Sequence, residues 1–168
     1  MNRNRINSRL CGFISILRNQ PQAEAIVKGS SDYSKISGKI RFYRTNFGVL
    51  IVSEVFGLPT STSECGNRVF GFHIHEGNMC SGDSNDPFSG AMTHYNPCDC
   101  KHPQHAGDMP PLFENDGYAF NIFLTNRFEI NEIIGRTVII HSNPDDFTTQ
   151  PSGDSGAKIA CGVIRRCS

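Results

Sequence analysis

The chain has 168 residues, which is long enough for one domain with a proper hydrophobic core. Acidic and basic side chains are equal in number, and the resulting formal net charge of zero argues against electrostatic binding to nucleic acid or to an anionic membrane. Only 19% of the residues are charged, 16 are glycine and nine are proline, and no apolar run is long enough to span a membrane, so strands and loops are favoured over a helical bundle.

Residues 1–20 are expected to form an extension before a domain of residues 21–168. Three arginines precede a short apolar stretch, residues 10–17, which is just long enough for the core of a signal peptide. Polar residues interrupt it at 18–20, and the candidate cleavage site Ala23-Glu24-Ala25 runs into the first expected strand. We therefore favour a short amphipathic turn or helix that lies on the domain over a signal peptide.

From residue 23 onward, short apolar or alternating runs separated by turn residues predict seven or eight strands in an antiparallel sandwich or barrel. Asn46-Phe47-Gly48 is typical of a hairpin turn. The last strand is expected at 157–165. We expect six phenylalanine side chains to be buried in the core: Phe42, Phe47, Phe56, Phe70, Phe120 and Phe123.

Two long segments interrupt the strand pattern. Residues 77–115 show no periodicity, and a loop of this length inside a domain is usually functional or disordered. Because this one holds three histidines and three cysteines, we expect an ordered loop that forms a site. A second irregular loop covers residues 142–156.

A pair of histidines lies in the expected strand 69–76. His73 and His75 are two residues apart, so their side chains project from the same face of the strand. His141 ends another apolar strand and is a natural third ligand. Neutral imidazoles in a nitrogen-rich site that is not tetrahedral favour copper.

The long loop supplies a second set of possible ligands, His94, His102, His105 and Asp108. Three imidazoles and one carboxylate make the closed tetrahedral set that is usual for structural zinc. Gly107 would let the backbone turn so that Asp108 faces the same ion. All six histidines of the chain then have a metal-binding role.

Five motifs, in this order, resemble those of the copper/zinc superoxide dismutase family. They are Gly71-Phe72-His73-Ile74-His75-Glu76, His94-Tyr95-Asn96-Pro97, His105-Ala106-Gly107-Asp108, Gly135-Arg136-Thr137-Val138-Ile139-Ile140-His141 and Ala160-Cys161-Gly162-Val163-Ile164. The resemblance covers roughly residues 23–166. It implies the architecture known for that family, an all-β, eight-stranded antiparallel Greek-key sandwich or barrel of immunoglobulin-like type with two long functional loops.

The resemblance also implies a role for each site residue. The copper ligands would be His73, His75, His94 and His141, and the zinc ligands would be His94, His102, His105 and Asp108. His94 would bridge the two ions through its two ring nitrogens. Asp145 would join a copper ligand to a zinc ligand and so fix the orientation of both imidazoles. Cys80 and Cys161 would form a disulfide between the long loop and the last strand.

The implied activity is dismutation of superoxide to oxygen and hydrogen peroxide on a redox-cycling copper, with zinc holding His94 in place. His94 would carry a proton to the second superoxide. Lys158 stands where the family usually has an arginine, and it would attract the anion with less orientation because it lacks the planar fork of arginine. Family members are often homodimers, so a homodimer is a further expectation.

Two other functions fit the same residues. A metal-binding module of this fold could store or deliver copper with little or no dismutase activity. A zinc-only structural or interaction domain could leave its copper site empty in the cell. Metal analysis separates the zinc-only domain from the other two, and an activity assay separates the enzyme from the copper carrier.

The seven cysteines are odd in number and leave at least one free thiol. We interpret Cys98 and Cys100 as loop thiols rather than as a soft-metal or redox pair, because the histidine set is already complete. Cys11, Cys65 and Cys167 carry no readable role. The spare thiols favour a cytoplasmic location over a secreted or periplasmic one.

Overall fold

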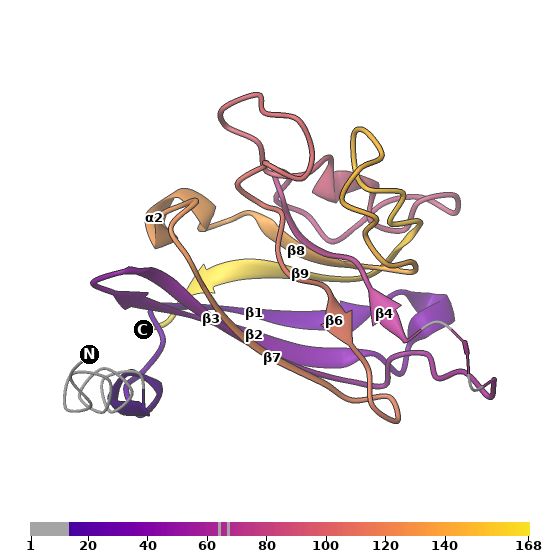
Figure 1. Ribbon diagram of the computed structural model, residues 1–168, viewed down its shortest axis with the longest axis horizontal. Helices are drawn as coiled ribbons and strands as arrows, with labels where there is room; N and C mark the ends of the chain where they lie inside the picture. Colours follow the sequence, from indigo (N-terminus) through magenta and orange to yellow (C-terminus); the bar gives the residue numbers. More distant parts are fainter. Residues whose placement is uncertain (1–13, 64, 67) are drawn as a thin grey trace, which may run out of the picture.

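A computed structural model describes residues 14–63, 65–66 and 68–168 of the chain (Figure 1). Its strands are β1 (Ala23–Gly29), β2 (Ser37–Thr45), β3 (Gly48–Phe56), β4 (Val69–Phe70), β5 (Phe72–His75), β6 (Leu112–Phe113), β7 (Ala119–Thr125), β8 (Thr137–His141) and β9 (Lys158–Arg166). Its short helices are η1 (Ser31–Tyr33), η2 (Ser89–Ala91) and α2 (Ile130–Ile133). The all-β prediction is confirmed, and α2 was missed because four residues are too few to show a helical period.

Seven strands form one antiparallel sheet in the order β5-β8-β9-β1-β2-β3-β7, which curls into a half-barrel (Figure 1). Strand β9 returns from the end of the chain to lie beside β1, and β1, β2 and β3 follow as neighbours. This is the order of a Greek key. Asn46 and Phe47 form the predicted hairpin turn, since Thr45 pairs with Gly48 across it.

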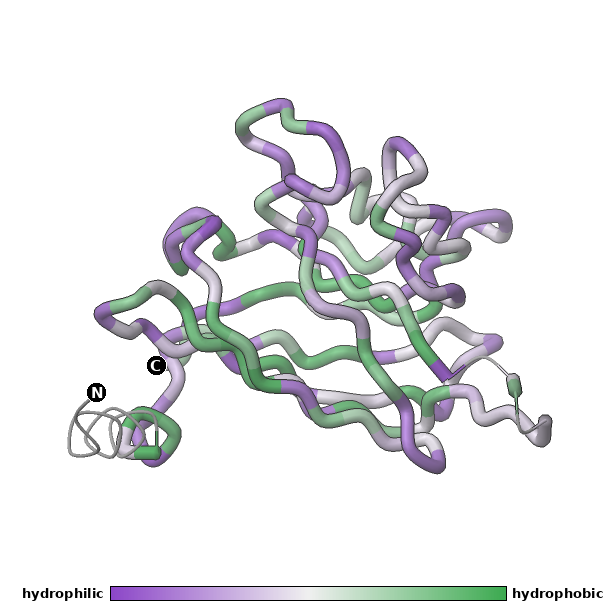
Figure 2. The backbone as a smooth tube through the Cα atoms, in the orientation of Figure 1, coloured by the Kyte–Doolittle hydropathy of each residue, from purple (hydrophilic) through white to green (hydrophobic). Residues whose placement is uncertain are grey.

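The core follows the two-residue period of the strands. In β1, Ala23, Ala25 and Val27 are fully buried, and they alternate with more exposed side chains. Ile40 and Phe42 of β2 join the same core cluster. Figure 2 shows the same separation, with hydrophobic segments along the strands and hydrophilic ones in the loops above them.

The aromatic side chains are only partly where the sequence placed them. Phe42 and Phe70 are buried, and Phe123 packs against the core. The prediction is wrong for the other three, since 59% of Phe47, 51% of Phe56 and 55% of Phe120 are exposed. Residues three apart in a strand point to opposite faces, so Phe120 and Phe123 cannot both be buried in one core.

The predicted histidine strand divides at Gly71. The segment before it, β4, pairs with β6, and the segment after it, β5, pairs with β8. Gly71 donates its N–H to Asn143 O at 2.7 Å and accepts the N–H of His141 at 2.8 Å. The change of partner places His73 beside Ile139 and His75 beside Thr137 of β8, the strand that ends at His141.

Residues 14–17 form a helical turn, and Ile16 packs against Tyr43, Leu50 and Val52 on the outer face of the sheet. This contact agrees with a helix that lies on the domain. The preceding residues, Cys11 among them, lie outside the described part of the chain. Within that part, no helix has the length and apolar character needed to cross a membrane.

Candidate metal centre

Two long loops, residues 76–111 and 142–157, lie together above β8 and β9 (Figure 1). A reciprocal pair of hydrogen bonds joins them. The backbone N–H of His102 donates to Gln150 Oε1 at 3.0 Å, and Gln150 Nε2 donates to His102 O at 2.8 Å. The second loop therefore holds the backbone of one predicted zinc ligand, a contact that sequence reasoning missed.

The structure brings the four predicted copper ligands together. The nitrogen ligand atoms of His73, His75, His94 and His141 all lie within 4.8 Å of one another, and all four residues are buried. Strand pairing explains the geometry, because β5 lies beside β8 and an isolated bridge links His75 to His94. These residues come from two strands and one loop.

Two of these imidazoles have a tautomer set by the backbone. The Nδ1–H of His75 donates to Met92 O at 2.9 Å, and the Nδ1–H of His141 donates to Gly156 O at 3.2 Å. A carbonyl can only accept, so each Nδ1 carries the proton and each Nε2 presents a lone pair. The two Nε2 atoms lie 3.2 Å apart, which is a fitting separation for two ligands of one ion.

The four predicted zinc ligands also converge. The Nδ1 atoms of His94 and His105 are 3.5 Å apart, His105 Nδ1 is 3.4 Å from Asp108 Oδ1, and His102 Nδ1 is 3.1 Å from Asp108 Oδ2. Ligand bonds of about 2.0–2.1 Å in tetrahedral geometry place donor atoms about 3.3 Å apart. The observed separations match a tetrahedral zinc site.

Gly107 is what allows Asp108 to reach this group. Its N–H donates to Tyr95 O at 2.8 Å, and its carbonyl accepts the N–H of Ile74 at 2.9 Å. A Cβ at this position would lie 2.2 Å from the carbonyl oxygen of Ile74. Only glycine permits this close approach, which brings Asp108 opposite His73 in an isolated bridge.

His94 faces both groups. Its Nδ1 lies 2.8 Å from Asp108 Oδ1, within the zinc group. Its Nε2 is buried and has no hydrogen-bond partner among the residues that the structure describes. One ring thus offers one nitrogen to each set of ligands.

Asp145 connects the two groups from behind. Its Oδ2 accepts a hydrogen bond from His73 Nε2 at 2.7 Å, and its Oδ1 accepts one from His102 Nε2 at 2.9 Å. Burial alone would raise the pKa of this carboxyl, but the hydrogen bonds from His73, the Phe147 backbone and His102 outweigh it and hold the pKa at about 2. Gly153 leaves room for this contact, since its Cβ would lie 2.1 Å from Asp145 Oδ1.

Burial also keeps two of the copper-group imidazoles neutral. It lowers the pKa of His73 to about 4 and that of His141 to about 3. Within the described part of the chain, three buried ring nitrogens have no hydrogen-bond partner: His73 Nδ1, His94 Nε2 and His102 Nδ1. Each of them points into one of the two ligand groups, and an unpaired buried polar atom is costly unless something binds it. The donor sets therefore fit copper and zinc.

The predicted disulfide is confirmed. Cys80 and Cys161 are bonded and join the long loop to β9. Cys65, Cys98, Cys100 and Cys167 are free, whereas Cys11 lies outside the described residues.

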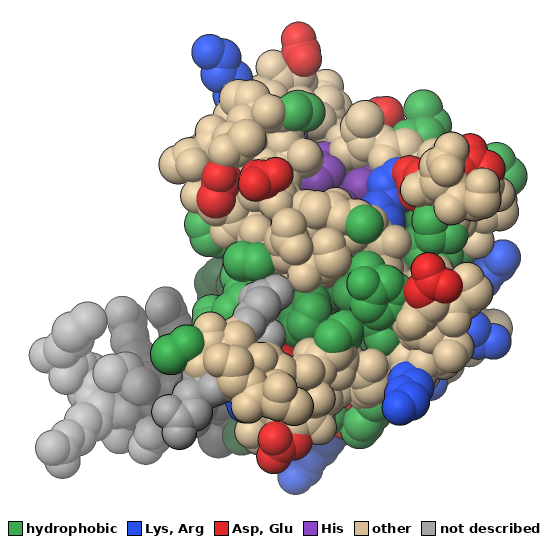
Figure 3. Space-filling model, turned by 90° about the vertical axis from the view of Figure 1, so that its right-hand side faces the viewer, with side chains coloured by type: hydrophobic (Ala, Val, Ile, Leu, Met, Phe, Trp, Pro, Cys, Tyr) green, Lys and Arg blue, Asp and Glu red, His purple; other side chains and the backbone are tan. Residues whose placement is uncertain are grey.

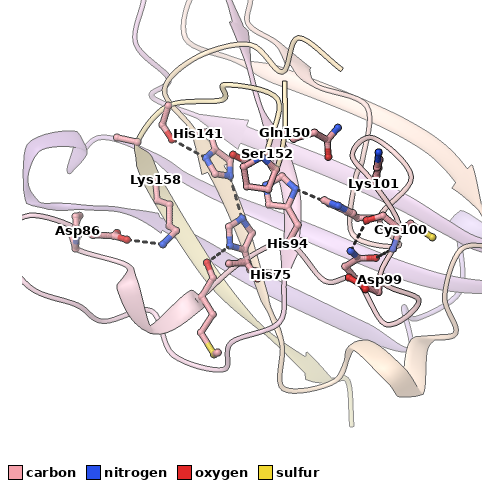
Figure 4. A pocket seen from close by; sticks show the side chains of 18 of the residues that line it. His75, Asp86, His94, Asp99, Cys100, Lys101, His141, Gln150, Ser152 and Lys158 are labelled. Atoms are coloured by element: carbon pink, nitrogen blue, oxygen red, sulfur yellow. Dashed lines mark hydrogen bonds and ion pairs between the residues drawn. The ribbon is translucent and has the colours of Figure 1, made fainter. Parts of the chain in front are cut away.

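The first ligand group opens into a pocket of about 770 Å³, which His75, His94, His141 and Lys158 help to line. In Figure 3 histidine side chains are visible at the floor of a hollow, with a basic side chain beside them. Figure 4 shows Lys158 reaching toward Asp86 at the wall of the pocket. Sequence reasoning identified Lys158 but gave no sign of Asp86, which is 72 residues away in the chain.

Arg127 was also missed. One of its guanidinium nitrogens, Nη1, donates to the carbonyls of Pro103 and His105 at 3.2 Å and of Asp108 at 3.4 Å. The segment that carries two of the zinc-group side chains is thereby attached to the loop after β7. No motif could have revealed this, because the acceptors are backbone atoms that every sequence has.

Comparisons with known proteins agree with this geometry. The family model for copper/zinc superoxide dismutase (SODC) matches residues 36–164. Superoxide dismutase [Cu-Zn] 2 of Aquifex aeolicus is 37% identical over 146 residues, which cover 78% of this chain and 80% of the relative. Superoxide dismutase [Cu-Zn] of Legionella pneumophila is 32% identical, and the match covers 76% of this chain and 77% of the relative. Superoxide dismutase [Cu-Zn] of Schizosaccharomyces pombe is also 32% identical, and the match covers 85% of this chain and 96% of the relative.

Proposed function

Since this chain belongs to the copper/zinc superoxide dismutase family, we propose that it dismutes superoxide at the two ligand groups described above. Copper would be held by His73, His75, His94 and His141, and zinc by His94, His102, His105 and Asp108. The observation that carries this assignment is the His94 ring, with Nδ1 in one group and an unpartnered Nε2 in the other.

Copper, when bound, supplies one-electron exchange with two superoxide ions in turn, oxidising the first to oxygen and reducing the second. Reduction to hydrogen peroxide needs two protons. His94 Nε2 is placed to hold one of them and pass it to the second superoxide, and water supplies the other. Asp145 and the carbonyls of Met92 and Gly156 keep four of the five remaining imidazoles, those of His73, His75, His102 and His141, in one tautomer and orientation.

Lys158 would attract the anion. It lines the pocket together with His75, His94 and His141, and its side chain is only 15% exposed. Lys158→Met should lower kcat/KM at low ionic strength and flatten its dependence on salt. Lys101→Met is the matched control, since Lys101 also lines the pocket. An unchanged rate for Lys158→Met at low ionic strength would refute this role.

Activity of the copper- and zinc-loaded protein tests the function as a whole. Metal analysis should find both metals, and dismutation should be far faster than that of a free copper-binding peptide. Rates near those of the peptide would support a copper carrier, and zinc without copper would support a structural domain. The family membership does not favour either alternative.

We also propose that the protein is a homodimer that associates through the outer face of β7. Phe120, Ile122 and Leu124 are exposed side by side on this face, and Phe56 of the neighbouring strand is exposed too. Strand β7 ends the seven-stranded order, so one of its edges has no partner strand in the described part of the chain. Ile122→Lys should give a monomer by sedimentation, whereas Ile26→Lys on β1 should not. A monomeric wild type would refute the proposal.

We infer a cytoplasmic location from the thiols. Cys65, Cys98 and Cys100 are free and exposed, a state that a reducing compartment preserves. Cell fractionation tests this, and recovery of the protein outside the cytoplasm would contradict it.

A further inference from the structure

The ammonium group of Lys158 is already occupied by an anionic side chain. Its Nζ donates to Asp86 Oδ2 at 2.6 Å and lies 3.3 Å from Phe88 O. An ammonium has three donors, so two are used and one remains for a ligand in the pocket. The short contact to Asp86 is a charge-assisted hydrogen bond, the stronger class of such bonds.

Asp86 is held in position for this contact. Its other carboxylate oxygen, Oδ1, accepts the N–H of Phe88 at 3.0 Å, and its own N–H donates to Asp83 Oδ1 at 3.1 Å. The disulfide from Cys80 to Cys161 attaches the same loop to β9, the strand that begins at Lys158. The ion pair therefore joins two segments that are fixed to each other by a covalent bond nearby.

The charges around the pocket balance. Its charged lining side chains, apart from the histidines, are Asp86, Asp99, Lys101 and Lys158, two of each sign. Figure 4 shows Asp86 and Lys158 on one side of the histidines, and Asp99 and Lys101 on the other. The lining side chains other than the histidines thus add no net charge to the charge that bound metals would bring to the pocket.

We propose that Asp86 is a positioning residue that sets the anion affinity of the pocket by holding and neutralising Lys158. This inference rests on the proposed role of Lys158 in attracting superoxide. Lysine lacks the planar fork that orients arginine, so Asp86 is needed to hold the ammonium beside the pocket. The negative charge of Asp86 also weakens the attraction between that ammonium and superoxide. Removing the negative charge while keeping the hydrogen-bond acceptor should leave Lys158 in place and strengthen its attraction.

Asp86→Asn makes this change when its single amide oxygen faces Lys158 Nζ, and the Phe88 N–H then gives up its Asp86 acceptor. One unit charge acting over about 5–8 Å in a water-like dielectric changes anion affinity about two- to fourfold. We therefore expect azide, a small anionic probe, to bind the copper- and zinc-loaded Asp86→Asn variant about two- to fourfold more tightly than wild type. Binding is followed by the visible absorption of copper, and the salt dependence of kcat/KM should become steeper.

Asp99→Asn is the matched control. It removes the same charge from the same pocket, no ion pair to Asp99 is found among the described residues, and asparagine tolerates the positive φ of 51° at this position. The azide affinity of Asp99→Asn should rise by less than half of the increase expected for Asp86→Asn. Equal effects of the two substitutions, or an unchanged or weaker affinity for Asp86→Asn, would overturn the inference, because the contact with Lys158 would then have no special role.

Two further variants separate this inference from the function it rests on. The double variant Asp86→Asn/Lys158→Met should bind azide more tightly than Lys158→Met, because the negative charge is gone, but less tightly than Asp86→Asn, because the lysine is gone too. If Lys158→Met weakens azide binding and Asp86→Asn leaves it unchanged, the role of Asp86 is wrong and that of Lys158 stands. If Lys158→Met binds azide like wild type, the anion role of Lys158 itself is wrong. Should Asp86→Asn fail to fold, Asp86→Ser offers a shorter acceptor without charge.

Discussion

Reduction of the Cys80–Cys161 disulfide should cost the metal-free protein about 4.5 kcal/mol of unfolding free energy. The bridge joins cysteines 81 residues apart in the sequence. In the chain-entropy model a closed loop of this size removes about 15 cal/mol/K from the unfolded chain, which is about 4.5 kcal/mol at 25 °C. A domain of this kind has about 5–15 kcal/mol of stability in total, so the reduced, metal-free chain should be close to unfolding.

Guanidinium denaturation of oxidised and reduced protein measures this difference directly. Metals must be removed first, because ions bound only to the folded state add their own stabilisation. The five other cysteines should be replaced by serine, which prevents disulfide exchange during the measurement.

The control is Cys98→Ser/Cys100→Ser in the oxidised protein, where both side chains are exposed and a change within about 0.5 kcal/mol is expected. A difference below about 1 kcal/mol between oxidised and reduced protein would refute the reasoning. It would mean that breaking this bond does not increase the conformational entropy of the unfolded chain as the model assumes.

Three further predictions concern the ligand groups. Asp145→Asn turns one of the two acceptor oxygens into a donor, so either His73 or His102 loses its acceptor. Chelator competition should then show about 10–100-fold weaker binding of the metal that this imidazole holds. Wild-type affinity for both metals would contradict this prediction. Arg127→Ala removes the donor to three loop carbonyls and should lower zinc affinity about tenfold while leaving copper affinity unchanged. Arg127→Lys should restore part of the zinc affinity. Unchanged zinc affinity in Arg127→Ala would show that the loop keeps its conformation without Arg127. Burial holds the pKa of His73 at about 4 and of His141 at about 3, below their ordinary 6.5, so the unfolded chain binds more protons than the folded one in acid. The metal-free protein should therefore lose stability as pH falls below 6.5, by about 2 kcal/mol per histidine at pH 5 in urea denaturation. Equal stability at pH 7 and pH 5 would show that these imidazoles are not buried as described.

Local patterns in the chain were sufficient for much of the architecture. The two-residue spacing of His73 and His75 is enough to place them on one face of a strand, because the side-chain period of a strand does not depend on its neighbours. Asn46-Phe47 turns the chain where the pattern predicted a hairpin. The same period, applied more strictly, would have shown that Phe120 and Phe123 face opposite ways.

By itself, then, the sequence determined that the chain is all-β and which side chains are chemically suited to copper and zinc, whereas the structure showed that the glycine before Asp108 is needed for a close approach to the Ile74 carbonyl. Only the tertiary structure decided which nitrogen of each imidazole is free and that Asp86 holds Lys158. It also decided that Arg127 binds the zinc-group loop. The physical reason is that these contacts depend on the paths of two long loops without periodicity, and several of their partners are backbone carbonyls that no side-chain pattern records.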